Sequence, residues 1–143
     1  TVQFDITIFN SGSAPARDVL IEGVMVIAGP TQDQEIGAFH AHPVGQGDRI
    51  PTIAPLSRIS IKSAVGLTRE QLRQFEMAGR ALFVPFVAFN ALYSWGGGEG
   101  QTSASYIVGK DTKGEKMAPF RLDMGARVFR NLAAREHSLR VRK

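Results

Sequence analysis

Two histidines spaced two residues apart, His40 and His42, form the pattern in this sequence most typical of a metal site. On an extended backbone, side chains two positions apart share a face, so both imidazoles could reach one ion. A third ligand is needed, and His137, Asp33 and Asp48 are the candidates. Because two histidines rarely suffice, surface or loop packing explains the pair more simply, and no cofactor is predicted. A metal-dependent enzyme using His40 and His42 is the least favoured hypothesis.

The residue patterns of other hydrolytic sites are missing from the sequence. There is no cysteine, no G-x-S-x-G elbow and no H-E-x-x-H motif. The candidates for general acid or base are Asp5, Asp18, Glu22, Glu99 and Asp123. Their spacing in the sequence does not require any two of them to lie close together. We therefore expect a protein that is not an enzyme.

Two glycine-containing segments, residues 10–16 and 94–103, resemble phosphate-binding loops only in composition. A phosphate loop leads directly into a helix whose first amides bind the anion, whereas both segments lie between predicted strands. Pro15 also removes a donor from the first segment, and Gln101 stands where a P-loop has lysine. We predict a simple bend at 10–16 and a five-residue hairpin turn at Gly96–Gly100, whose glycines supply positive φ angles.

Aromatic residues gather in the strand predicted at residues 81–95, and most of them are expected to fill the core because large aromatics are usually buried. They are Phe83, Phe86, Phe89, Tyr93 and Trp95. Tyr93 and Trp95 are two apart and share a face, so in an exposed position they would form a contact patch with Glu99 for a glycan or a peptide. A ligand-binding module using the hairpin region 93–100 is the first alternative function.

Positive charge is concentrated at the C-terminal end of the chain. The net charge is +4, but residues 110–143 alone hold ten Lys and Arg against four Asp and Glu. A solvated surface explains this most simply; the alternative is a patch of Arg127, Arg130 and Arg135 that binds an anionic partner. Nucleic acid is not a predicted partner, because Phe129 is the one aromatic residue among the tail arginines and residues 1–109 are slightly acidic.

Hydrophobic alternation with a period of two predicts most of the chain to be strands. The predicted strands are Val2–Ile8, Val19–Ala28, Asp48–Ile53, Ser57–Val65, Ala81–Trp95 and Gln101–Gly109, with a further short strand within Met117–Met124. Thr31 with Gln34, and Thr68 with Gln71, fit capping boxes and predict two short helices. Ile36 and Phe39, spaced i, i+3, are expected to be the apolar stripe of the first. Periodicity does not decide between strand and helical turn at Val128–Ala134.

Strands in this order, without a βαβ rhythm, favour two antiparallel sheets packed face to face. The predicted fold class is all-β, an immunoglobulin-like antiparallel β-sandwich with one or two short helices in the connections. Residues 1–109 are expected to form the sandwich. Residues 110–143 are expected to be a basic C-terminal extension that could pack on it.

Three turn segments carry a resemblance to a known family. The first strand ends in Asn10-Ser11-Gly12, the second begins at Ala16-Arg17-Asp18-Val19, and Ala54-Pro55-Leu56 precedes an alternating strand. Over Val2–Gly109 the chain resembles the bacterial immunoglobulin-like, adhesion-related domains called CARDB, which have Asn-x-Gly, Ala-x-x-Val and Leu-Ala-Pro-Gly at these places. Leu56 stands where that family has its glycine.

The resemblance implies a non-catalytic interaction or structural domain of a larger bacterial envelope protein. Its partner would be a protein or an envelope component, and its location the periplasmic, extracytoplasmic side of a membrane, with a cytoplasmic location as the alternative. The longest apolar run, Ala81–Phe89, is too short to span a bilayer. Since the chain starts at Thr1 without methionine, we expect it to be a segment of a longer protein, and the resemblance implies membrane attachment through a part outside this chain.

Overall fold

The smaller sheet of the protein is built from the two most regularly alternating segments. β1 (Val2–Phe9) and β4 (Arg58–Val65) pair antiparallel, with Ile6 opposite Ile61. Their isoleucines point inward and pack on β2 and β3, while the polar row between them faces solvent. The predicted strands at both places are confirmed.

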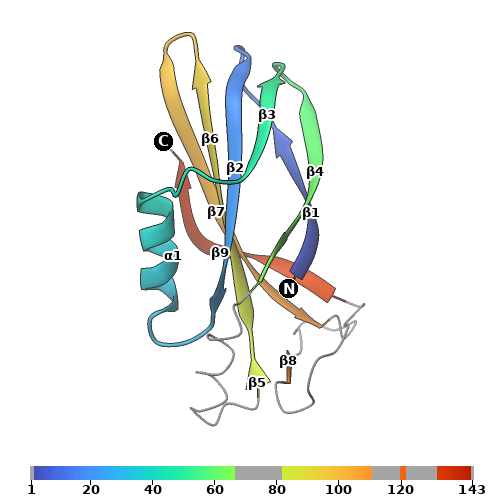
Figure 1. Ribbon diagram of the computed structural model, residues 1–143, viewed down its shortest axis with the longest axis vertical. Coiled ribbons are helices and arrows are strands. Elements are labelled where there is room, and N and C mark those ends of the chain that lie inside the picture. The colour runs from blue at the N-terminus through green and yellow to red at the C-terminus, as the bar shows by residue number, and fades with distance from the viewer. Residues whose placement is uncertain (1, 67–81, 111–119, 122–131, 143) are drawn as a thin grey trace.

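In the described part of the chain, the larger sheet has five antiparallel strands in the order β3-β2-β6-β7-β9. They are β3 (Asp48–Ile53), β2 (Ala16–Ile27), β6 (Pro85–Trp95), β7 (Gly98–Lys110) and β9 (Leu132–Arg142). A short separate pair joins β5 (Leu82–Phe83) to β8 (Phe120–Arg121). Figure 1 shows the β1–β4 pair on one side of the large sheet and the helix on the other.

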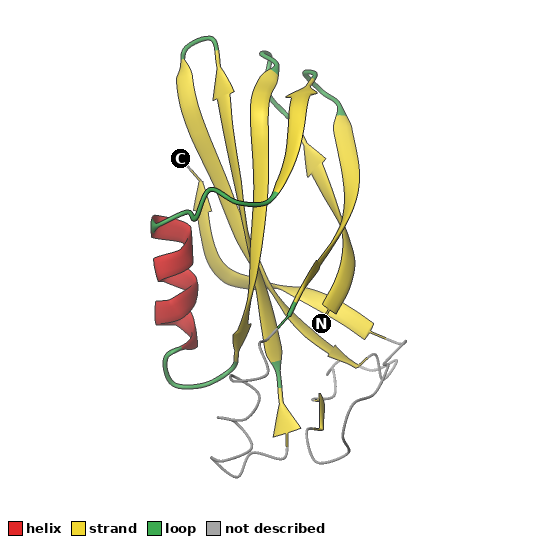
Figure 2. Ribbon diagram, viewed as in Figure 1, coloured by secondary structure: helices red, strands yellow, loops and turns green. Residues whose placement is uncertain are grey.

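The computed structural model describes residues 2–66, 82–110, 120–121 and 132–142, and in these residues the predicted all-β sandwich is confirmed (Figure 2). The helix predicted after Thr68 lies outside the described residues. So does most of the strand predicted within Met117–Met124, of which β8 is the described part. β9 begins at Leu132, so the last three residues of Val128–Ala134 are strand and not a helical turn. β9 pairs with β7 as the fifth strand of the large sheet.

The large sheet has the β1–β4 pair on one face, and the helix α1 (Gln32–Ala41) covers the opposite face. Ile36 and Phe39, spaced i, i+3, pack on Val26 and Phe86, so the predicted helix and its apolar stripe are confirmed. The predicted capping box is wrong, because the Thr31 side chain makes no cap bond and its hydroxyl donates to Glu35 instead. Among the described residues, no helix combines the length and hydropathy needed to cross a bilayer.

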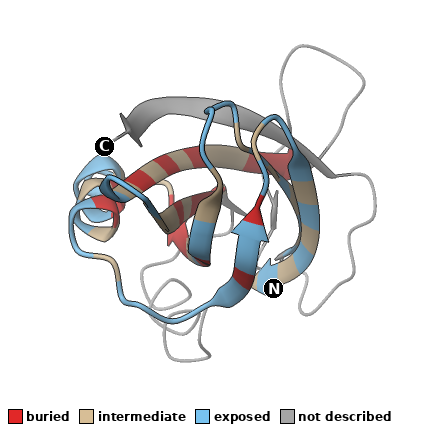
Figure 3. Ribbon diagram, turned by 90° about the horizontal axis from the view of Figure 1, so that it is seen from above, coloured by how far each residue is buried: buried red, intermediate tan, exposed pale blue. Residues whose placement is uncertain are grey.

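Strand β2 is buried on both faces because it lies between the small sheet and α1. Four consecutive residues, Val19–Glu22, are buried, which a strand with one solvent face would not allow. A β-bulge between Arg17 and Leu20 places Asp18 at a φ of +50°. Seen from above, the buried residues gather along the strands between the helix and the β1–β4 pair (Figure 3).

The segment at residues 10–16 is a bend held by one side chain, as its composition predicts. The Asn10 amide donates to the carbonyls of Ala14 and Ile53, and its Oδ1 accepts from the Gly12 N–H. The Asn10 backbone also bonds Ser57 and Leu56 in the β3–β4 turn. Asn10 therefore ties the β1–β2 connection to the turn that joins the two sheets.

The hairpin between β6 and β7 is tighter than predicted. Only Gly96 and Gly97 form its turn, and Gly98 already pairs with Trp95. Of the glycines at 96–100, Gly98 alone has a positive φ, at +151°. The five-residue turn is therefore wrong, because cross-strand pairing continues to the tip and leaves two residues for the connection.

Candidate functional site

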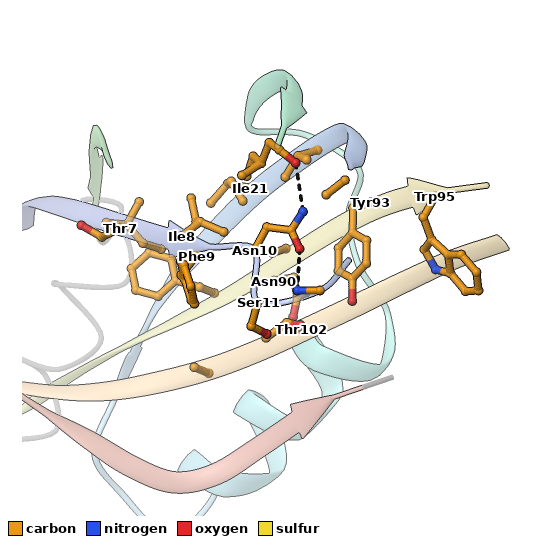
Figure 4. Close-up of a pocket in the computed structure, with 18 of the residues that line it drawn as sticks. Thr7, Ile8, Phe9, Asn10, Ser11, Ile21, Asn90, Tyr93, Trp95 and Thr102 are labelled. Carbon is orange, nitrogen blue, oxygen red and sulfur yellow. Dashed lines mark hydrogen bonds between the residues drawn. The ribbon is translucent and has the colours of Figure 1, made fainter. Parts of the chain in front are cut away.

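A cleft of about 810 Å³ opens between β1 and the strands β6 and β7. Its floor is the face of the large sheet that looks toward β1, and its wall is β1 with the bend that follows; the floor residues include Phe89, Ala91, Tyr93, Thr102, Ala104 and Tyr106. The cleft exists because the small sheet has two strands and the large sheet five, so β6 and β7 extend past β1 without a covering strand among the described residues. Figure 4 shows Thr7, Ile8 and Phe9 on the wall and Tyr93 and Trp95 at one end.

The described residues that line the cleft are uncharged. Each of them is apolar, aromatic, a hydroxyl residue, glycine, proline or asparagine. Small side chains, Ala91, Thr102 and Ala104, lie between the larger rings of Phe89, Tyr93 and Tyr106. Such a surface favours a neutral ligand that carries apolar groups, since a desolvated charge would find no partner there.

Tyr93 and Trp95 meet at one end of this cleft because they are two apart on β6. Each ring lies over a glycine of the opposite strand or turn: Tyr93 over Gly100, and Trp95 over Gly97, where a Cβ would have no room. Trp95 is 46% exposed, so its expected place in the core is wrong. The small sheet does not reach the hairpin tip, which leaves the indole half open.

Glu99, grouped with this pair from the sequence, does not line the cleft. It is exposed and lies opposite Ser94, whose side chain alternates with those of Tyr93 and Trp95 and so points to the other face of the sheet. Of the basic patch, Arg127 and Arg130 lie outside the described residues. Arg135 lies on β9, where its backbone pairs with Ile107.

His40 and His42 do not share a face, because the extended backbone assumed for them is wrong. His40 is on the last turn of α1 and is 1% exposed, whereas His42 is the C-cap residue and exposed. Among the residues that the structure describes, no three histidine, aspartate or glutamate side chains come together to hold a metal ion.

His40 instead belongs to a buried polar cluster under α1, formed by Glu22, His40, Asn90, Gln101 and Ser103. Asn90 is its centre: Nδ2 donates to Glu22 Oε1 and to the Phe39 carbonyl, and Oδ1 accepts from Ser103 Oγ at 2.7 Å. With its amide fixed in this way, Asn90 Oδ1 is also the acceptor for His40 Nδ1 at 2.9 Å. The imidazole is therefore held as an Nδ1–H donor.

The same cluster anchors the chain that follows α1. Glu22 accepts the backbone N–H groups of Val44 and Gly45 at 3.0 and 2.8 Å, and Gln101 Nε2 donates to the His40 carbonyl. The His40 Nε2 atom has no hydrogen-bond partner within the described part of the chain. Because its groups are almost fully buried, the cluster is suited to holding α1 on the sheet rather than to meeting a substrate.

This polar cluster is not among the sites predicted from the sequence, although the sequence contains a signal for it. Asn90 interrupts an otherwise apolar run, and His40 lies four residues after Ile36 on the same helical face. A polar residue in a buried strand requires partners, which would have pointed to polar groups on neighbouring elements. The cleft left a weaker signal, because nothing in a local pattern shows that one sheet is narrower than the other.

No protein-family model matches the chain, and comparisons with curated proteins and with solved structures find no similar protein.

Proposed function

We propose that this domain is a non-catalytic interaction module that binds an extended, uncharged segment of another protein in the cleft between β1 and the β6–β7 hairpin. The observation that carries the proposal is the neutral, largely apolar lining of a cleft that spans several residues of three strands. A site of this kind recognises by shape and burial of apolar surface.

The chemistry of the cleft supports binding over catalysis. Within the described part of the chain its lining residues include serines, threonines and tyrosines but no Asp, Glu, His or Lys that could act as general base or acid beside them. The titratable side chains Glu22 and His40 lie in the buried polar cluster, on the opposite face of the large sheet. A peptide is favoured over a glycan because charged or amide side chains for sugar hydroxyls are few: among the described lining residues the amides are Asn10 and Asn90, and the Asn90 amide is buried in the polar cluster on the opposite face.

The envelope location and the place of this domain in a larger bacterial protein stay predictions that rest on the resemblance to CARDB domains. An extracytoplasmic interaction domain would use such a cleft for assembly with a neighbouring envelope protein.

The test is selection of a displayed library of random peptides about nine residues long, the length of one strand, on the immobilised domain. Trp95 is the single tryptophan of the chain and lies at the cleft, so its fluorescence reports binding of each selected peptide in solution. We expect selected sequences that are uncharged over five or more positions and that shift Trp95 emission to the blue.

Ala104→Glu places a charge on the cleft floor and is expected to weaken binding about tenfold or more. Ala64→Glu is the matched control, because Ala64 is exposed on β4 and is not part of the cleft. Equal affinity of both variants, or selection of no peptide, contradicts the proposal. Neutral oligosaccharides that shift Trp95 emission while peptides do not would assign the cleft to a glycan instead.

A further inference from the structure

The outer edge of β1 has no pairing strand among the described residues, and it forms one wall of the cleft. β1 pairs with β4 along its whole length and with no other strand of the described chain. Thr7 and Phe9 line the cleft although their side chains lie on the outer face, where Thr7 bonds Ser60 and Phe9 contacts Arg58. The cleft therefore extends to the backbone edge of β1.

The register shows which backbone groups face this edge. Asn10 N–H donates to the Ser57 carbonyl at 2.9 Å, just beyond the last ladder pair, so Phe9 and Arg58 are a non-hydrogen-bonded pair of the β1–β4 ladder. In an antiparallel ladder the two kinds of pair alternate, so Phe4, Ile6 and Ile8 bond β4. Asp5, Thr7 and Phe9 consequently direct their N–H and C=O groups away from β4, toward the cleft.

The space beside that edge suits one more strand. β1 lies over β2 and β6, since Ile6 and Ile8 pack with Ile21 and Ala91 and the Phe4 ring contacts Phe89. Neighbouring strands are about 4.8 Å apart and packed sheets about 10 Å apart. A third strand beside β1 would therefore lie above β6 and β7, with alternate side chains on Ala91, Thr102 and Ala104.

A second copy of this chain does not suit the same space. If two copies paired antiparallel through their β1 edges, their small sheets would form one continuous sheet, and both large sheets would lie on the same side of it. The strands β7 and β9 of each copy extend past β1, so the two large sheets would occupy the same volume. A single extended segment meets no such obstacle.

Resting on the proposed function, we infer that the partner segment binds as a β-strand added to the free edge of β1. Its backbone pairs with the outward groups of Asp5, Thr7 and Phe9, and every second side chain, apolar and uncharged, enters the cleft toward β6 and β7. This is strand addition, in which main-chain hydrogen bonds hold the ligand and the alternating pockets select its sequence.

The first test uses the peptide selected on the domain, methylated at its backbone nitrogens in two alternate sets. One set removes the N–H groups that face β1, and the other removes those that face solvent. We expect methylation of the N–H groups that face β1 to weaken binding about tenfold or more. Methylation of the N–H groups that face solvent should leave the affinity within about twofold. Equal effects of the two sets overturn strand addition and leave the proposed cleft binding intact, whereas failure to select any peptide overturns both.

The second test is on the protein. Thr7→Pro removes an N–H that faces the cleft without removing a bond to β4, a position where strands accept proline. It is expected to weaken peptide binding about tenfold. Lys62→Pro is the matched control, because Lys62 is exposed on β4, is not part of the cleft, and pairs with Asp5 so that its N–H faces the other edge of the small sheet; this variant should bind like the unchanged chain. Undiminished binding by a folded Thr7→Pro variant overturns the inference; if that variant does not fold, the methylated peptides decide.

Discussion

At the scale of single residues, the Asn90 side chain makes hydrogen bonds to three other elements of the fold. Its amide satisfies a carboxylate from β2, a carbonyl and an imidazole from α1, and a hydroxyl from β7. Four elements that are distant in the sequence are thus fixed relative to one another by one side chain with no exposed surface. Replacing Asn90 would remove hydrogen bonds from buried side chains that water does not reach to take its place.

Asn90→Ala is expected to lower the free energy of unfolding by about 3–5 kcal/mol. The Glu22 side chain would lose a side-chain donor, and Ser103 and His40 would lose their shared acceptor, in a region closed to water. Urea unfolding followed by circular dichroism measures the loss. Ser94→Ala on the same strand is the control, expected to cost less than about 0.5 kcal/mol because its one bond is long and exposed. A loss below about 1 kcal/mol for Asn90→Ala would show that the cluster is not a stabilising network.

At the scale of elements, the turn between β3 and β4 contains the clearest local conflict in the fold. Ser57 N–H bonds the Ala54 carbonyl, with Pro55 and Leu56 in the central positions and Leu56 at a φ of +58°. This is the turn type that favours glycine in its third position. Leu56 is 73% exposed, so its side chain gains little from burial to offset the strain.

Leu56→Gly is therefore expected to raise the free energy of unfolding by about 0.5–1 kcal/mol. The relief of left-handed strain exceeds the entropy that glycine adds to the unfolded chain. Val44→Gly is the matched control: Val44 is also an exposed apolar residue, but it lacks a positive φ, so glycine there should destabilise. Thermal unfolding of both variants distinguishes strain from a general effect of removing exposed side chains; a lower midpoint for Leu56→Gly contradicts the account.

Elements with a strict local period could be predicted from the sequence, and those fixed by distant partners could not. The rows of β1 and β4 and the stripe of Ile36 and Phe39 follow from spacing alone. Glycine content shows where the chain bends at the hairpin, but the length of the turn depends on cross-strand pairing, which continues up to Trp95 and Gly98. The residue types of His40 and His42 carry no information on the helix that ends there, so their spacing alone cannot distinguish an extended from a helical backbone.

At the scale of the whole molecule, the unequal widths of the two sheets produce both the core and the cleft. The β1–β4 pair covers β2, β3 and part of β6, α1 covers the opposite face, and the floor formed by β7 and the rest of β6 stays accessible beside β1. The unequal width of the two sheets cannot be predicted from any one segment of the sequence, because it depends on how many strands, far apart in the chain, pair with one another. The residues of the site, Tyr93 and Trp95, could be named from the sequence, whereas the wall opposite them could not.

The place of β9 in the large sheet makes a prediction about the C-terminal part of the chain. β9 pairs with β7 from Lys110 to Thr102, and without it β7 would become a long unpaired edge next to the buried Val108 and Ser105. A chain that ends at Asn131 is expected to lose its cooperative unfolding transition in urea and to associate. A chain that ends at Arg142 keeps the whole strand and should unfold like the full chain, within about 0.5 kcal/mol. If the shorter chain unfolds cooperatively at the same urea concentration, β9 is an attachment to a sandwich that is already stable, and the large sheet needs only four strands.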